Sequence, residues 1–172
     1  MGEVLTRAAG YDDDFFLWTQ EQAQALRALG RERFNAPVDW ENVAEEIESL
    51  GKRDRRACES QIGNIILHLL KLRHLPWDES RNGWEKEIRG FRKSLRRILR
   101  DSPSLQPSVE EIALAEQDDA VQDVVDELKK VKNDNDAVYL KLLQGVDWLI
   151  FNSNQIQDAS FFPERQTPDG IS

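Results

Sequence analysis

The stretch Asp39–Gly51, with the sequence DWENVAEEIESLG, decides the fold that this chain is expected to adopt. Asp39 is a typical N-cap residue, and Gly51 is a typical residue at the end of a helix. Between them, apolar residues recur at spacings of three and four, which is the pattern of an amphipathic α-helix. These residues are Trp40, Val43, Ile47 and Leu50. We therefore predict a helix whose apolar stripe packs inward and which ends or kinks at Gly51.

The longest apolar segment, Ile62–Leu75, follows after a short charged stretch. It predicts a second apolar helix, which runs from about Lys52 to His74 and is stopped by Pro76. The inner stripe of this helix is expected to consist of Cys58, Ile62, Ile65, Leu69 and Leu72. Because further apolar residues cover most of its circumference, we predict that this helix is central and buried nearly all round.

Similar patterns predict further helices over residues 13–29, 80–100 and 108–132, and a short helix over 138–151. Gly30 is expected to end the first of these helices. The aromatic residues Phe161 and Phe162 are expected to pack onto the bundle. We therefore predict an all-α protein: a single helical bundle of about five to six helices. It is expected to form one domain over residues 1–172, with loosely ordered residues 1–10 and 164–172.

Charge is unevenly distributed along the chain, whose net charge is −9. Residues 1–50 have 4 basic and 11 acidic side chains, residues 51–100 have 14 and 6, and residues 101–172 have 5 and 15. A basic centre therefore lies between acidic ends. We favour the explanation that acidic helices pack near the basic ones and neutralise them. The alternative is a basic surface that binds an anion.

The composition indicates a protein of the cytoplasm. The chain has one cysteine, Cys58, so a reducing compartment is expected. Residues 1–4 are not followed by a basic leader and a long apolar run, so no secretory signal is predicted. The longest nearly uncharged run, Gln61–Leu70, is too short to span a bilayer. We therefore predict a soluble cytoplasmic protein with no membrane partner.

Four short motifs give the chain a family resemblance. They are YDDDFFLWTQEQ at Tyr11–Gln22, WENVAEEIESLG at Trp40–Gly51, ILHLLK at Ile66–Lys71 and DSPSL at Asp101–Leu105. Together they resemble domain-of-unknown-function family 29, which consists of small bacterial proteins, common in cyanobacteria and mostly of unassigned activity. The resemblance covers about residues 11–130, and Phe161–Glu164 resembles the family's ending. It implies an all-helical fold and no known reaction, whereas residues 133–154 depart from the expected pattern.

Histidines and carboxylates are the candidate metal ligands. The two histidines, His68 and His74, are six residues apart, so on one helix they point about 240° apart and cannot share an ion. The Glu-x-x-His signature of di-metal bundles is absent. A mononuclear site between helices, formed by Glu46 and His68, is one hypothesis, because both lie at the edge of an apolar stripe. We favour the alternative that these two side chains form a buried hydrogen bond which fixes the helix register.

No motif indicates catalysis. Cys58 has no basic partner that the sequence identifies, so it is interpreted as a small core residue rather than a nucleophile. Neither a G-x-S-x-G elbow nor a glycine-rich phosphate loop occurs. We therefore predict no cofactor and favour a protein that is not an enzyme.

A basic helix face is the candidate anion site. It is formed by Arg89, Lys93, Arg96, Arg97 and Arg100, with Arg53 and Arg56 on a neighbouring helix. Such a face could hold phosphates or RNA. We favour a solvated face that pairs partly with Glu85 and Glu87, because the net negative charge opposes strong nucleic-acid binding.

Protein interaction is the function that remains. Trp18, Trp77 and Trp148 are candidate exposed anchors for a partner. The apolar stripe of the helix predicted over 108–132 is patchy, so it could instead be buried against a second copy in a homodimer. By elimination, we predict a non-catalytic helical protein that binds a protein partner or itself.

Overall fold

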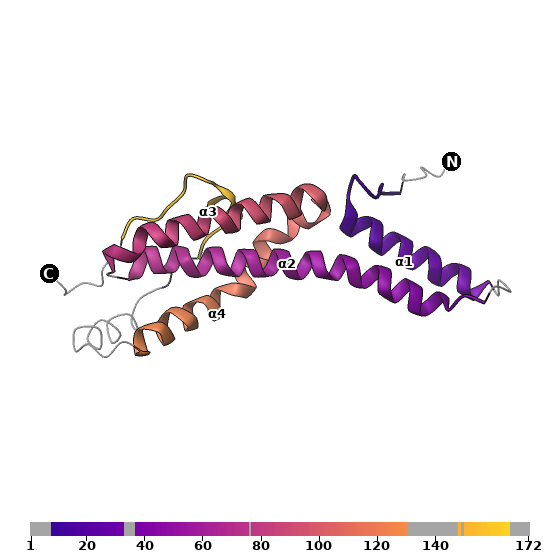
Figure 1. Cartoon of the computed structure of the whole chain (residues 1–172), viewed down its shortest axis with the longest axis horizontal. Coiled ribbons are helices and arrows are strands. Elements are labelled where there is room, and N and C mark those ends of the chain that lie inside the picture. Colours follow the sequence, from indigo (N-terminus) through magenta and orange to yellow (C-terminus); the bar gives the residue numbers. More distant parts are fainter. Residues whose placement is uncertain (1–7, 33–36, 76, 131–147, 149, 166–172) are drawn as a thin grey trace. The chain divides into compact units, whose positions relative to one another are not determined.

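The computed structural model of the chain describes residues 8–32, 37–75, 77–130, 148 and 150–165. The protein is all-α, as predicted, and its described residues contain no strand. The helices are α1 (Phe15–Arg31), α2 (Trp40–His74), α3 (Asp78–Asp101), the 3₁₀ helix η1 (Pro103–Ser108), α4 (Val109–Lys130) and α6 (Ser153–Gln157) (Figure 1). The helix predicted over 138–151 falls almost entirely outside the described residues.

The contacts between residues divide the chain into two compact units. Unit 1 consists of Met1–Cys58 and Arg97–Pro107, and unit 2 consists of Glu59–Arg96 and Ser108–Ser172. Helices α2 and α3 each contribute to both units. The prediction of a single domain over residues 1–172 stays a prediction.

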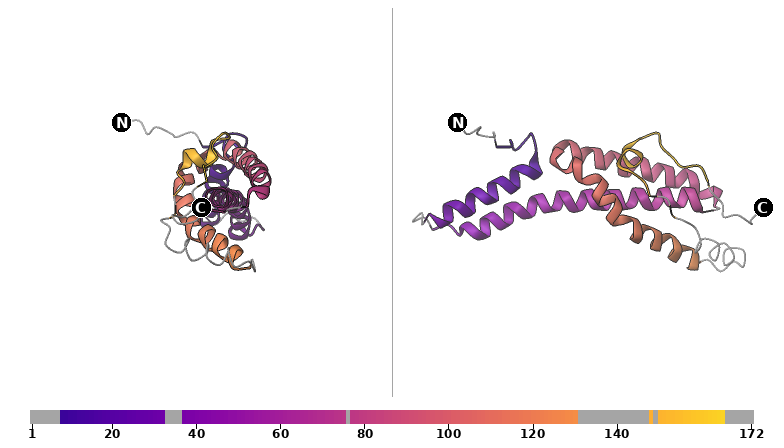
Figure 2. Two further views of the ribbon diagram at one scale, coloured as in Figure 1. Left: turned by 90° about the vertical axis from the view of Figure 1, so that its left-hand side faces the viewer. Right: turned by 180° about the vertical axis from the view of Figure 1, so that it is seen from behind.

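Unit 1 is built on a helical hairpin in which α1 lies antiparallel beside the first part of α2 (Figures 1 and 2). The predicted break at Gly51 is wrong, because α2 continues through this residue to His74. A Cβ atom added to Gly51 would overlap Thr19 Oγ1 and lie 3.3 Å from Phe16 Cδ2. The glycine therefore serves the close approach of α1 rather than the end of a helix.

The predicted helix end at Gly30 is wrong for a similar reason. Gly30 lies inside α1, which continues to Arg31 and is capped at Glu32. A Cβ atom at Gly30 would lie only 2.9 Å from Cβ of Trp40, the first residue of α2. Both glycines of the hairpin thus stand where the two helices need small residues at their contact.

Two of the sequence motifs meet at the start of α1. Asp14 caps this helix, since its Oδ1 accepts a hydrogen bond from Leu17 N at 2.9 Å. Its Oδ2 accepts one from Ser104 N at 2.6 Å. The buried Ser102 Oγ accepts from Phe16 N at 3.1 Å and donates to Asp54 Oδ2 at 3.0 Å. The YDDDF and DSPSL motifs therefore encode a polar cluster that anchors the N-terminus of α1 to the segment after α3.

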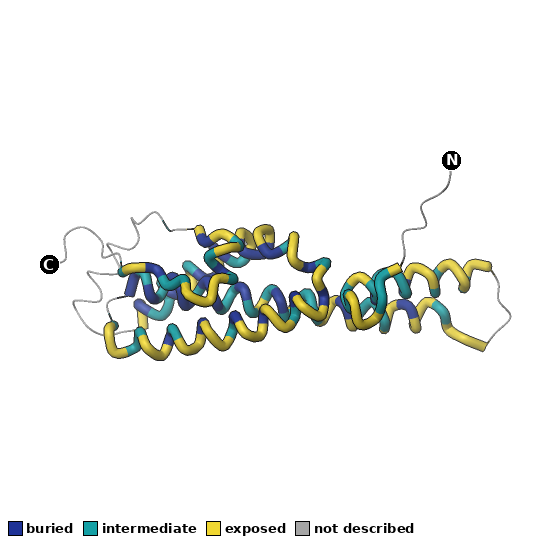
Figure 3. The backbone as a smooth tube through the Cα atoms, turned by 90° about the horizontal axis from the view of Figure 1, so that it is seen from above, coloured by how far each residue is buried: buried dark blue, intermediate teal, exposed yellow. Residues whose placement is uncertain are grey.

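Unit 2 holds most of the apolar core, which consists of the later part of α2 together with α3, α4 and the segment around α6. The stripe predicted for α2 is confirmed, because Cys58 in unit 1 and the later stripe residues in unit 2 are all fully buried. Those later residues are Ile62, Ile65, Leu69 and Leu72. Figure 3 shows this concentration of buried positions, whereas the two helices of the unit 1 hairpin carry mainly intermediate and exposed ones.

An arginine lies within this core. Arg92 on α3 is only 1% exposed, and its guanidinium donates three hydrogen bonds to backbone carbonyls. The acceptors are the carbonyl oxygens of Gln155 at 2.7 Å, Ile156 at 2.8 Å and Phe161 at 2.9 Å. The first two belong to the end of α6, where a cation meets the negative end of the helix dipole. Burial lowers the pKa of Arg92 to about 10.

Candidate interaction surface

An ion-pair cluster occupies one side of the unit 1 hairpin. Arg27 on α1 donates to Glu41 Oε1 at 2.9 Å and to Glu48 Oε2 at 2.8 Å on α2. Lys52 Nζ lies 2.9 Å from Glu48 Oε1. The hydrogen bonds from Lys52 and Arg27 lower the pKa of the Glu48 carboxyl. These contacts identify the side of the hairpin on which α1 and α2 are joined by charge.

The opposite side of the hairpin is apolar. Leu29, Val43 and Leu50 each follow one of the three cross-helix ion-paired residues by two positions. Because two residues turn an α-helix by about 200°, each of the three side chains points away from the ion-pair cluster. They remain 39%, 40% and 38% exposed, respectively. We call this set, Leu29, Val43 and Leu50, the apolar strip.

The apolar stripe predicted for the first part of α2 does not face α1 in full. Val43 and Leu50 were expected to face inward, yet α1 instead covers the side of Ala44 and Gly51, both of which are buried. Small residues let the two helix backbones come close, so α1 packs on that side. Half of the expected apolar stripe is consequently uncovered in the chain by itself. A group of exposed apolar residues on one face is typical of an interaction site.

Two exposed charges border the strip along α2. Glu46 and Arg53 lie seven residues apart, with Leu50 between them, so they are on nearly the same line of the helix. They follow Val43 and Leu50 by three residues each, which places them at one edge of the apolar line. The edge therefore carries a negative charge on one side of Leu50 and a positive charge on the other.

The three tryptophans that the sequence suggested as exposed anchors, Trp18, Trp77 and Trp148, are not part of the apolar strip. The tryptophans proposed as exposed anchors are half-buried and pack against rings of the same chain. Ring centroids lie 4.9 Å apart for Trp18 and Tyr11, 6.3 Å for Trp77 and Trp84, and 4.7 Å for Trp148 and His74. The stripe of α4 is also largely covered within the chain, through Val109, Ile112, Val124 and Leu128. The exposed apolar strip of unit 1 was not predicted from the sequence.

The structure does not bring Glu46 and His68 together. Both lie on α2, 22 residues apart, Glu46 in the part that belongs to unit 1 and His68 in the part that belongs to unit 2. His68 instead donates from Nδ1 to the carbonyl of Asn64 at 2.7 Å, and its Nε2 lies 2.8 Å from Glu87 Oε2. The Asn64 carbonyl therefore occupies Nδ1, and the Glu87 carboxylate lies beside Nε2. The carboxylate beside His68 is thus that of Glu87, which is 55% exposed, and the predicted Glu46–His68 pair stays a prediction.

The residues of the predicted basic face lie on α3, and their role as an anion site stays a prediction. The side chains of Arg89, Lys93, Arg96, Arg97 and Arg100 are all exposed. Arg89 pairs with Glu85 at 2.9 Å, as predicted, and its guanidinium also lies over the ring of Phe162. Arg100 pairs with Asp101 at 2.9 Å. Lys93, Arg96 and Arg97 make up the remainder of the face.

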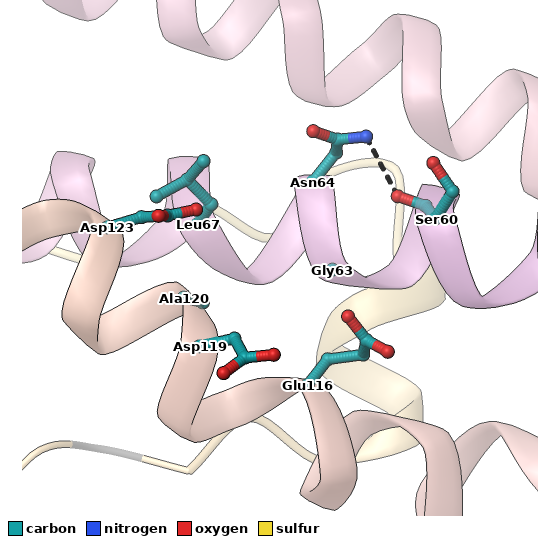
Figure 4. A pocket seen from close by; sticks show the side chains of 8 residues that line it. All are labelled: Ser60, Gly63, Asn64, Leu67, Glu116, Asp119, Ala120 and Asp123. Atoms are coloured by element: carbon teal, nitrogen blue, oxygen red, sulfur yellow. Dashed lines mark hydrogen bonds between the residues drawn. The ribbon is translucent and has the colours of Figure 1, made fainter.

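An acidic cavity of about 200 Å³ lies between α2 and α4 in unit 2. It is lined by Ser60, Gly63, Asn64, Leu67, Glu116, Asp119, Ala120 and Asp123 (Figure 4). Burial, reinforced by the charges of Asp119 and Glu59, raises the pKa of Glu116. In the part of the chain that the structure describes, no three His, Cys, Asp or Glu side chains converge in a way that could hold a metal ion.

The described residues thus form an all-helical protein. A family model described as domain of unknown function DUF29 matches residues 11–143, and the chain belongs to this family. The chain is also similar to a crystal structure of an alpha-helical protein of unknown function from Rhodospirillum rubrum ATCC 11170. The TM-score is 0.66 at 24% sequence identity, over 88% of this chain and 91% of the other, so this likeness shows the fold alone. Among proteins with a curated function, none matches this chain. None of the described helices has the length and apolar content needed to cross a membrane.

Proposed function

We propose that this protein works by binding another protein chain through the apolar strip of unit 1, without catalysing a reaction. The observation that carries the proposal is the exposure of Leu29, Val43 and Leu50 on one side of the α1–α2 hairpin. A hairpin of two helices buries only part of the apolar surface of each helix. A further helix laid against the strip would remove the remainder from water, at roughly 25 cal/mol per Å² of apolar surface.

The test compares two leucines of equal exposure. Leu50 belongs to the strip, and Leu17, which is 39% exposed, lies two residues before the buried Thr19 and so points to the outer side of α1. Fluorescently labelled chains carrying Leu50→Glu or Leu17→Glu are added to concentrated extract of the source cells, and their sedimentation is measured. We expect the wild type and Leu17→Glu to sediment as complexes larger than 19.9 kDa and Leu50→Glu to sediment at the size of the free chain.

Two outcomes contradict the proposal. A wild-type chain that sediments at its own mass in the extract has no partner there. Equal losses in the Leu17→Glu and Leu50→Glu chains would assign the effect to unfolding or to surface charge rather than to the strip. Circular dichroism of both purified variants serves as the folding control.

Phosphate or RNA binding by α3 is the second candidate function. It is supported by the exposure of Lys93, Arg96 and Arg97 on one helix. Three such phosphate contacts predict that the logarithm of the affinity for a single-stranded RNA oligonucleotide falls with the logarithm of salt at a slope of roughly −2. Arg96→Glu should weaken that binding. An affinity that is unchanged between about 50 and 200 mM salt would contradict this function.

A further inference from the structure

We infer that the partner of the apolar strip is a second copy of this chain, which pairs antiparallel with its α2 so that Leu50 lies on the two-fold axis. This inference rests on the proposed function and names its partner. It is argued from the order of apolar and charged residues along the exposed side of α2, and all of the residues that carry it belong to unit 1.

The apolar positions repeat every seven residues. Val43, Leu50 and Ala57 occupy equivalent positions on α2. Val43 is 40% exposed, Leu50 is 38% exposed and Ala57 is partly buried. Between them, Glu46 and Arg53 take the alternate positions, at spacings of three and four. One set of these heptad positions is apolar, as in the seam of a two-helix coiled coil, whereas the other set carries the two charges. Because this line of residues lies along one stretch of α2, the same stretch of a second copy of α2 has the matching repeat and can pack along it.

The charges of the seam specify the orientation. They are reversed about Leu50, since Glu46 precedes it by four residues and Arg53 follows it by three. In an antiparallel pair centred on Leu50, Glu46 of one copy comes level, to within about 1.5 Å, with Arg53 of the other. Val43 of each copy then faces Ala57 of the other. In a parallel pair, by contrast, Glu46 would face Glu46 and Arg53 would face Arg53, which is unfavourable.

Symmetry makes this arrangement self-complementary. In an interface with two-fold symmetry, whenever residue i contacts residue j, residue j also contacts residue i. The same surface on each copy therefore supplies both Glu46–Arg53 ion pairs and the contact between the two Leu50 side chains. No second type of protein is required for the complementarity of charge to be complete.

Disulfide trapping tests the geometry. The purified full chain carries Cys58→Ser, which removes the one native cysteine, and then Leu50→Cys, Val43→Cys, Ala57→Cys or Leu17→Cys. We expect oxidation to cross-link the Leu50→Cys chain to itself, because a residue on the axis meets its own copy. The Val43→Cys chain should not cross-link to itself, because its two copies lie about 21 Å apart along the helices, but it should cross-link to the Ala57→Cys chain. Leu17→Cys measures the background of random collisions.

Charge exchange gives the second readout. Glu46→Arg and Arg53→Glu should each weaken dimerisation at least about tenfold, since each creates two like-charged pairs. A chain with both substitutions should return to within about threefold of the wild-type dissociation constant, because the pairs are restored with reversed sign.

The outcomes separate this inference from the proposed function. Self-cross-linking at Val43→Cys as strong as at Leu50→Cys would mean parallel pairing and overturn the inference. A purified chain that stays monomeric, while Leu50→Glu still abolishes the complex in cell extract, would overturn the second copy as partner and leave the proposed function standing. If Leu50→Glu changes neither the purified chain nor the extract, both fail.

Discussion

At the scale of single residues, the ionisation of His74 is strongly coupled to folding. Its side chain is 1% exposed at the end of α2. Burial, with a smaller contribution from the charge of Arg73, lowers its pKa from 6.5 to about 4. The unfolded chain takes up a proton near pH 6.5, whereas the folded chain resists it. The contribution of His74 to stability is therefore complete above pH 6.5 and is lost as the pH falls towards 4.

This linkage predicts a difference between the wild type and His74→Phe. Between pH 6.5 and 4 the unfolding free energy of the wild type should fall by up to about 3 kcal/mol more than that of the variant, because phenylalanine cannot bind a proton. Urea unfolding across this pH range measures the two curves. Since all other titrating groups are shared, parallel curves would contradict the buried, neutral state of His74.

Arg92 carries the second prediction at this scale. Lysine keeps the positive charge but lacks the planar arrangement of donors that reaches the carbonyls of Gln155, Ile156 and Phe161. Arg92→Lys should therefore lower the unfolding free energy by about 2–4 kcal/mol, because buried acceptors lose their partners. Arg96→Lys, on the exposed side of the same helix, should change it by no more than about 0.5 kcal/mol. Equal effects of the two substitutions in denaturant unfolding would show that the carbonyl contacts contribute little.

The position of Arg92 in the sequence indicates that it is buried, whereas its charge suggests the opposite. It stands four residues after Ile88 and three before Leu95, on the line of the apolar stripe of α3. Position alone would place it inward, but arginine is rarely buried unless it is fully paired. Its acceptors come from a segment more than 60 residues away, so no local pattern could reveal them.

At the scale of helices, the contact between α1 and α2 depends on Gly51. Gly51→Ala should destabilise the chain by about 1 kcal/mol, because the overlap with the buried Thr19 outweighs the gain of roughly 1 kcal/mol that alanine brings to a helix interior. Gly83→Ala in α3 is the control, since its Cβ atom would meet nothing within 4 Å. We expect that control to be stabilising by up to about 1 kcal/mol. Thermal or urea unfolding measures both, and a stabilised Gly51→Ala chain would contradict the close approach.

The helices were largely predictable, but their ends and their covered sides were not. The 3–4 spacing of apolar residues located α3 and α4 to within a few residues, and it located the two segments that together form α2. Gly30 and Gly51 were interpreted as helix ends, because the sequence does not distinguish a terminal glycine from one that admits a neighbouring helix. For the same reason the side that α1 covers, and hence the exposure of Val43 and Leu50, became visible only in three dimensions.

The candidate site was predictable only in its parts. The positions of the basic residues on α3 follow from their spacing and their side chains are exposed, whereas their role in binding an anion stays a prediction. Glu46 is a polar residue at the edge of an apolar stripe, and its pairing with His68 stays a prediction, whereas His68 itself lies beside Asn64 and Glu87. The charge reversal from Glu46 to Arg53 was present in the sequence throughout, and it gains meaning only once Leu50 is known to be exposed.

At the scale of the whole molecule, the central claim is that the chain functions by pairing with a second copy of itself through the apolar strip. A native mass spectrum of the wild-type chain, purified without chelator, tests this claim most directly. We predict a dimer of twice 19.9 kDa that the Leu50→Glu chain fails to form. A wild-type spectrum that contains only the monomer would contradict the claim, and a monomer carrying one stoichiometric metal ion would favour a metal-dependent function in its place.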